Sequence, residues 1–311
     1  MNNIAIRVSG VSIRYIIGDF KDIGLKEFVM RKLTRNYRVE EFWADKNISF
    51  NLSKGDMLGI IGSNGAGKST LLKAISGVMI PTTGTIDVCG NIAALLELTS
   101  GFDGDLTVKE NTYLRGAMLG YSRSFMDEKY NEIINFSELN NYEERPFKQL
   151  SSGMKSRLAF SIACLVNPDV LILDEVLAVG DGAFRKKSGD KMREILSSGV
   201  TGILVSHSTD QIRELCNKVL WLDHGKQICF SDDVNLYLDA YEEFLVNKVL
   251  PHNDEDARLM SKNYQKRKET ELNEKKKKEI AKIESVIENG DENAIMAAIN
   301  IIKKNNPELL K

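Results

Sequence analysis

The sequence has 311 residues, of which 42% are hydrophobic and 28% are charged, and it contains five prolines. These proportions are typical of a folded globular protein, and the length allows one large α/β domain with an appendage. A net charge of −2 gives no electrostatic reason to expect a nucleic-acid partner. Apolar runs are only strand-length, and residues 1–9 lack the features of a signal peptide, so we expect no transmembrane segment and a cytoplasmic location.

The organisation of the chain changes near residue 235. Before it, short β-rich runs alternate with helical patterns, which predicts an α/β domain around a mainly parallel sheet. After it, charged helical patterns replace the alternation. We therefore expect an α/β domain over residues 1–235 and a helical C-terminal extension over residues 236–311.

Two basic segments stand apart from this alternation. Residues 19–41 place Leu25, Phe28 and Leu33 at helical spacing among lysines and arginines, which predicts a basic amphipathic insertion. It fits either a position near membrane or phosphate groups or an ordinary surface helix. The lysine run 275–278 fits either contact with anionic lipid or a solvated helical face.

A glycine-rich segment follows the apolar strand pattern of residues 58–61 and precedes an apolar helical pattern. This is a P-loop in its strand-loop-helix context, where backbone N–H groups and a helix N-terminus surround phosphates. Lys68 is expected to reach the β- and γ-phosphates, and Ser69 to ligate Mg²⁺. The predicted ATP-binding residues of the loop are Gly62, Ser63, Asn64, Gly65, Ala66, Gly67, Lys68, Ser69 and Thr70.

A second strand pattern begins at Asp169, continues with the apolar run 170–173 and ends in the carboxylates Asp174 and Glu175. After a complete P-loop, such a pair indicates a Walker B segment. Asp174 is expected to hold the Mg²⁺ shell. Glu175 is expected to act as the general base that activates water, so we predict an ATPase that uses ATP and Mg²⁺.

The segment Leu150-Ser151-Ser152-Gly153-Met154 precedes a clear helical pattern and lies just upstream of Asp174. It resembles the signature sequence of ABC ATPases, usually Leu-Ser-Gly-Gly-Gln, with Ser152 and Met154 as departures from it. The resemblance implies that Ser151, Ser152 and Gly153 contact the γ-phosphate of ATP held on a second subunit, in a homodimer. It also implies an ABC-type P-loop NTPase fold with a mainly parallel core, an antiparallel β subdomain and a helical signature subdomain.

Four further residues take expected roles from the same resemblance. His207 resembles the switch histidine that holds the γ-phosphate, and Asp181 lies at the position of the D-loop, where subunits contact each other. Glu97 lies where the family's Q-loop glutamine would be expected and could ligate Mg²⁺ directly or through water, although residues 96–97 could equally be an ordinary strand end. Tyr15 is the candidate for stacking on adenine, with Trp43 or Phe42 as alternatives.

The segments Phe42-Trp43-Ala44, 151–154 and 174–181 together resemble the ATPases of bacterial O-antigen, capsule and teichoic-acid exporters. The resemblance implies a peripheral subunit at the cytoplasmic face of the cell membrane. Its partners would be separate membrane permease subunits and, as cargo, a lipid-linked polysaccharide or polyol-phosphate polymer. The alternatives are an ABC ATPase of another transporter type or a soluble ABC protein that does not transport.

Overall fold

The computed structural model describes residues 3–17, 40–95, 101–166, 168–174, 181–206 and 208–288. The chain forms two compact units, Met1–Tyr237 and Leu238–Lys311. Glu97, Glu175 and His207 lie outside the described residues, as does nearly all of the expected insertion. Its last two residues, Glu40 and Glu41, belong to strand β2 (Glu40–Ser53).

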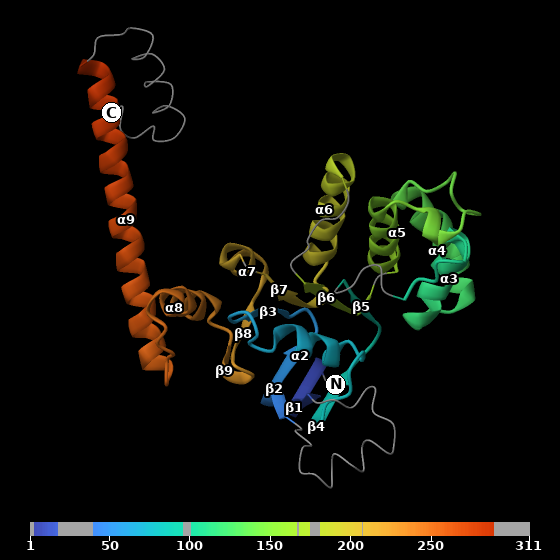
Figure 1. Cartoon of the computed structure of the whole chain (residues 1–311), viewed down its shortest axis with the longest axis horizontal. Helices are drawn as coiled ribbons and strands as arrows, with labels where there is room; N and C mark the ends of the chain where they lie inside the picture. The colour runs from blue at the N-terminus through green and yellow to red at the C-terminus, as the bar shows by residue number, and fades with distance from the viewer. Residues whose placement is uncertain are drawn as a thin grey trace, which may run out of the picture. The chain divides into compact units, whose positions relative to one another are not determined.

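The first unit is built on a nine-stranded sheet of the described residues, in the order β4-β1-β2-β9-β8-β3-β7-β6-β5. Strands β4, β1 and β2 pair antiparallel, whereas β8, β3, β7, β6 and β5 run parallel. The predicted α/β class, with a mainly parallel core and an antiparallel β subdomain, is therefore confirmed (Figure 1). Besides β2, the strands are β1 (Ile4–Ile17), β3 (Met57–Ile61), β4 (Thr83–Val88), β5 (Ile92–Ala94), β6 (Val170–Asp174), β7 (Thr201–Val205), β8 (Lys218–Asp223) and β9 (Lys226–Ser231).

The centre of the parallel sheet is apolar on both faces. All residues of β3 and β7 are buried, and in β6 only the terminal Asp174 is partly exposed. Continuous apolar runs of this length are what a parallel sheet covered on both sides requires. The core between these strands and helix α2 (Lys68–Ile75) includes Leu58, Leu72 and Ile172. This packing holds the loop between β3 and α2 in place.

A group of helices within the first unit lies close together (Figure 1), and these helices share an apolar core. It consists of α3 (Val108–Met118), α4 (Arg123–Ser137), the 3-10 turn η1 (Phe147–Gln149) and α5 (Ser152–Leu165). Val108, Ile133 and Leu158, one from each α-helix, are fully buried together. This is the predicted helical subdomain, with α5 as the helix that follows the signature segment. Helices α6 (Gly182–Ser197) and α7 (Thr209–Leu215) belong to the α/β part of the unit.

The described part of the second unit is helical, as the C-terminal composition predicts. It contains most of α8 (Val234–Asn247) and all of α9 (Asp254–Glu288). The two helices are joined by polar contacts, in which Asp239 accepts hydrogen bonds from Ser261 at 3.1 Å and Gln265 at 2.9 Å. None of the helices in the described ranges combines the length and apolarity needed to span a membrane.

Candidate nucleotide-binding site

The loop after β3 has a backbone that only glycine accommodates at two points. Gly62 and Gly67 have φ angles of 150° and 107°. A Cβ atom would lie 2.2 Å from the Leu222 carbonyl oxygen at Gly62, and 2.2 Å from Asp45 Oδ1 at Gly67. Close backbone packing below the loop therefore requires glycine, and the loop turns tightly into α2.

The concave side of this loop carries a cation. Lys68, the first residue of α2, extends back over the loop and donates hydrogen bonds to the carbonyl oxygens of Gly62, at 2.6 Å, and Ser63, at 3.0 Å. The first turn of α2 contains no acidic side chain, and Ser69 in it is exposed. A helix N-terminus with an adjacent ammonium group suits a phosphate chain. The residues present therefore fit a nucleoside triphosphate.

Strand register brings Asp174 to the same edge of the sheet as the loop. Both Ile60 of β3 and Asp174 of β6 pair with Val205 of β7, which lies between their strands. Because the three strands are parallel, their carboxyl ends lie at one edge, where ligands of such sheets bind. The described residues contain no group of three or more His, Cys, Asp or Glu side chains arranged for a metal. Mg²⁺ held by one or two protein ligands and substrate phosphates needs no such group.

Asp45 is a buried carboxylate that the sequence did not single out. Its exposed fraction is zero, and neither side-chain oxygen has a hydrogen-bond partner in the described part of the chain. Burial raises its pKa from 3.8 to about 7. It packs beneath the loop, against Gly67, so an ionisable group lies directly behind the phosphate site.

The three aromatic candidates for adenine binding lie on the antiparallel strands β1 and β2. Tyr15 pairs directly with Phe42, and its hydroxyl oxygen is 3.5 Å from Thr70 Oγ1 at the end of the loop. Trp43 instead packs against the Arg14 guanidinium, 5.6 Å from its ring centroid. The Tyr15 side chain thus reaches the phosphate-loop segment, which favours it as the adenine contact.

The signature segment forms an exposed helix start. Ser151 is the N-cap of α5 and accepts a hydrogen bond from the Met154 backbone N–H at 3.3 Å. Ser151 and Ser152 are exposed, and a Cβ atom at Gly153 would meet only Ser151 Oγ, at 4.0 Å. No acidic residue lies in the first turn. An open helix N-terminus of this kind can receive an anion from outside.

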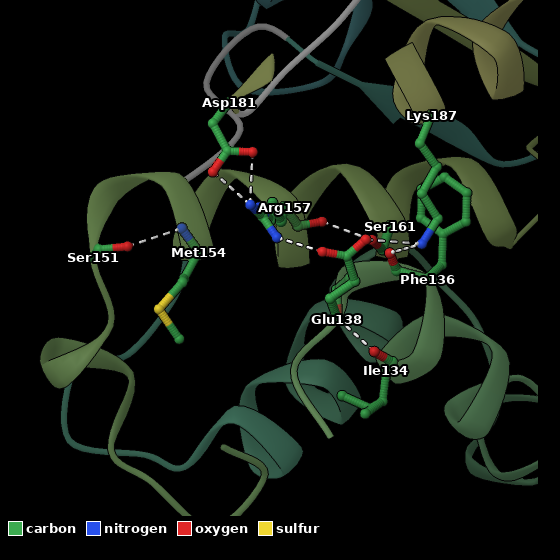
Figure 2. A network of polar contacts seen from close by, with 10 residues as sticks. Ile134, Phe136, Glu138, Ser151, Met154, Arg157, Ser161, Asp181 and Lys187 are labelled. Carbon is green, nitrogen blue, oxygen red and sulfur yellow. Dashed lines mark hydrogen bonds and ion pairs between the residues drawn. The ribbon is translucent and has the colours of Figure 1, made fainter. Parts of the chain in front are cut away.

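Asp181, the residue expected at the D-loop position, is held within its own chain by Arg157 of α5 (Figure 2). The Arg157 guanidinium donates to both Asp181 oxygens, at 2.7 and 2.6 Å, and to Glu138 Oε2, at 2.7 Å. We missed Arg157 and Glu138 in the sequence, where Arg157 stands out only as a charge near the start of an apolar helix. The ion pairs link residues 19 and 24 positions apart.

The P-loop, the parallel sheet and Asp174 at its edge define a P-loop nucleotide-binding protein. Comparison with known families agrees: the family described as ABC transporter matches residues 46–178. The chain belongs to the ATP-binding proteins of the ABC transporter family. A solved ATP-binding subunit of an ABC transporter has a TM-score of 0.56 at 19% identity, covering 83% of this chain and 99% of that one, which shows the same fold.

Two relatives are similar in sequence as well. Over 243 residues the chain is 40% identical to the teichoic acids export ATP-binding protein TagH of Bacillus anthracis, covering 78% of this chain and 43% of that protein. Over 223 residues it is 38% identical to the O-antigen export system ATP-binding protein RfbB of Klebsiella pneumoniae, covering 71% and 91%. The chain thus spans less than half of the first relative and most of the second. The predicted resemblance to polysaccharide and teichoic-acid exporter ATPases is confirmed.

Proposed function

We propose that this chain is the ATP-hydrolysing subunit of an exporter that moves a lipid-linked polysaccharide or teichoic-acid-like polymer across the cell membrane. The observation that supports the proposal is the presence, in one unit, of two elements suited to binding phosphate. One is the loop with Lys68, and the other is the exposed N-terminus of α5. Two copies placed head to tail would each complete the other's site, which supports a homodimer that holds ATP at its interface.

Each residue of the proposed site has a chemical task. Lys68 and the loop N–H groups bind the phosphates, while Ser69 and Asp174, with Glu97, would hold Mg²⁺, which neutralises charge on the β- and γ-oxygens. Glu175 accepts a proton from water as the water oxygen bonds to the γ-phosphorus and the bond to the ADP oxygen breaks. His207 orients the γ-phosphate, and the partner's signature segment covers it from the opposite side.

The proposed cargo and partners rest on the relatives. TagH and RfbB are described as export ATP-binding proteins for teichoic acids and O-antigen. By analogy, the chain would attach to separate permease subunits at the cytoplasmic face of the membrane, and ATP-driven association and separation of its two copies would move the permease. The alternative of a soluble ABC protein finds no support among these relatives.

Glu175→Gln tests the sandwich mechanism. Glutamine keeps the size of the side chain but cannot accept the proton, so ATP should bind without being hydrolysed. We expect dimers in the presence of ATP and Mg²⁺ and monomers without nucleotide, measured by multi-angle light scattering. Monomers under both conditions would contradict a two-subunit site. In cells, the same variant should accumulate the lipid-linked polymer on the inner side of the membrane, and this accumulation tests the cargo class.

Replacing Tyr15 by alanine tests the adenine contact. Stacking of an aromatic ring on a base contributes about 1–3 kcal/mol, so we expect the dissociation constant for ATP to rise about tenfold. Phe42→Ala is the matched control, because Phe42 lies directly opposite on β2. Titration with a fluorescent ATP analogue distinguishes the two. An effect of Phe42→Ala larger than that of Tyr15→Ala would move the adenine contact to Phe42.

A further inference from the structure

Glu138 occupies a backbone position that disfavours its own side chain. It is the C-cap of α4, with φ 63° and ψ 34°, in the left-handed region. Glycine is the usual residue there, because it carries no Cβ atom to clash with the backbone. A glutamate at this point therefore suggests a task for its carboxylate.

The carboxylate of Glu138 bridges two cations from two other helices (Figure 2). Oε2 accepts a hydrogen bond from Arg157 of α5 at 2.7 Å, and Oε1 lies 3.4 Å from Lys187 Nζ of α6. Lys187 also donates to the Phe136 carbonyl oxygen at 2.9 Å. Glu138 thus connects the end of α4 to α5, which carries Arg157, and to α6, whose N-cap is Asp181.

Arg157, which Glu138 holds in place, in turn contacts Asp181. Its guanidinium lies 5.1 Å from the Phe184 ring centroid, and only 17% of its side chain is exposed. One nitrogen, Nη1, faces Glu138, and the other, Nη2, contacts both oxygens of Asp181. Because the guanidinium is planar and rigid, a hydrogen bond that fixes Nη1 also fixes the direction in which Nη2 donates. The place of Asp181 therefore depends on Glu138.

Asp181 contacts Arg157 instead of capping its own helix. It is the N-cap of α6, where an aspartate side chain commonly accepts hydrogen bonds from the first turn, yet it makes no such bond here. The Asp181 side chain is nevertheless 70% exposed. The arrangement holds the side chain at the surface rather than folded onto its own helix.

We propose that Glu138 is a positioning residue that orients Arg157 and, through it, presents the Asp181 carboxylate to the partner subunit. This inference rests on the proposed function, in which two subunits close on ATP. Glu138 contacts Arg157 and Lys187 rather than the P-loop, so its removal should weaken closure while leaving nucleotide binding to the single subunit intact.

Glu138→Gly in the Glu175→Gln background is the decisive variant. Glycine suits the left-handed backbone, so the unfolding temperature should stay the same or rise. The dimer dissociation constant at saturating ATP should increase about tenfold, and the monomer's ATP affinity should change less than twofold. The parent Glu175→Gln protein must itself form the ATP-dependent dimer. If it does not, the proposed function fails, independently of Glu138.

A matched pair and a double-mutant cycle complete the test. Glu138→Gln should weaken dimerisation, whereas Glu132→Gln should not. Glu132 lies in α4, has the same 49% side-chain exposure and, among the described residues, forms an ion pair with Lys129 alone. In an Asp181→Asn background, the effect of Glu138→Gly should fall below twofold. A dimer constant unchanged by Glu138→Gly, or an equal tenfold effect without Asp181, would overturn the proposal. The proposal would also be overturned if Glu138→Gly and Glu138→Gln both lowered the unfolding temperature and the ATP affinity together.

Discussion

Replacing Lys68 by alanine is expected to raise the dissociation constant for MgATP about 100-fold. The ammonium group lies within the loop, 2.6 and 3.0 Å from two of its carbonyl oxygens, where a phosphate chain would meet it. Hydrogen bonds to charged groups contribute about 1.5–3 kcal/mol each, and 1.4 kcal/mol corresponds to a factor of ten. Loss of one or two of them gives the expected change.

Titration calorimetry with ATP and Mg²⁺ measures this effect directly. Lys73→Ala is the control, because Lys73 is the basic residue in the last turn of the same helix. It should bind ATP as the unmodified protein does. If Lys68→Ala bound ATP with an affinity within threefold of that of the unmodified protein, the loop would not hold the triphosphate.

Replacing Asp45 by asparagine should change how stability depends on pH. In the folded chain, burial raises the pKa of Asp45 from 3.8 to about 7, so the folded state holds a proton that the unfolded chain releases. Between about pH 4 and pH 7, the free energy of unfolding should therefore fall as pH rises. The total is about 4 kcal/mol, from roughly three pKa units at about 1.4 kcal/mol each.

Asparagine cannot ionise, so Asp45→Asn should lack this contribution. Relative to the original protein, the variant should gain stability from pH 5 to pH 7 and change no further above that. Each kcal/mol corresponds to about 2–4 °C in unfolding temperature for a unit of this size. Thermal unfolding at pH 5, 6, 7 and 8 measures it, with the exposed Asp87→Asn on β4 as control. A pH-independent difference between Asp45→Asn and the original protein would mean that Asp45 is ionised throughout.

The nucleotide site was predictable because its chemistry is local in the sequence. The P-loop needs closely spaced glycines and a lysine within one short segment, and the strand before Asp174 is a continuous apolar run. The structure places both at one edge of the sheet, as parallel strands require. The helical start at Ser151 also follows from a short segment, since an N-cap and its helix are adjacent. These features carried the family assignment that the relatives then confirmed.

The inward position of Asp45 could not be predicted from the alternation of residues along its strand. Counting back from the buried residues Leu52, Phe50 and Ile48, strict alternation would point Asp45 outward. A register shift against β1 between the pairs Val11–Ile48 and Ile13–Asp45, with Asn47 at φ 53°, reverses the alternation. The carboxylate therefore faces the core.

From the sequence alone follow the nucleotide chemistry, the α/β class and the exporter resemblance, since each depends on neighbouring residues or on a repeating pattern. Only the tertiary structure decided that Asp45 lies beneath Gly67 and that Glu138, Arg157 and Asp181 form one chain of contacts. Such contacts join helices and strands that are distant in sequence. Their geometry depends on a bulge, a left-handed helix end and the packing of three helices, none of which a short motif specifies.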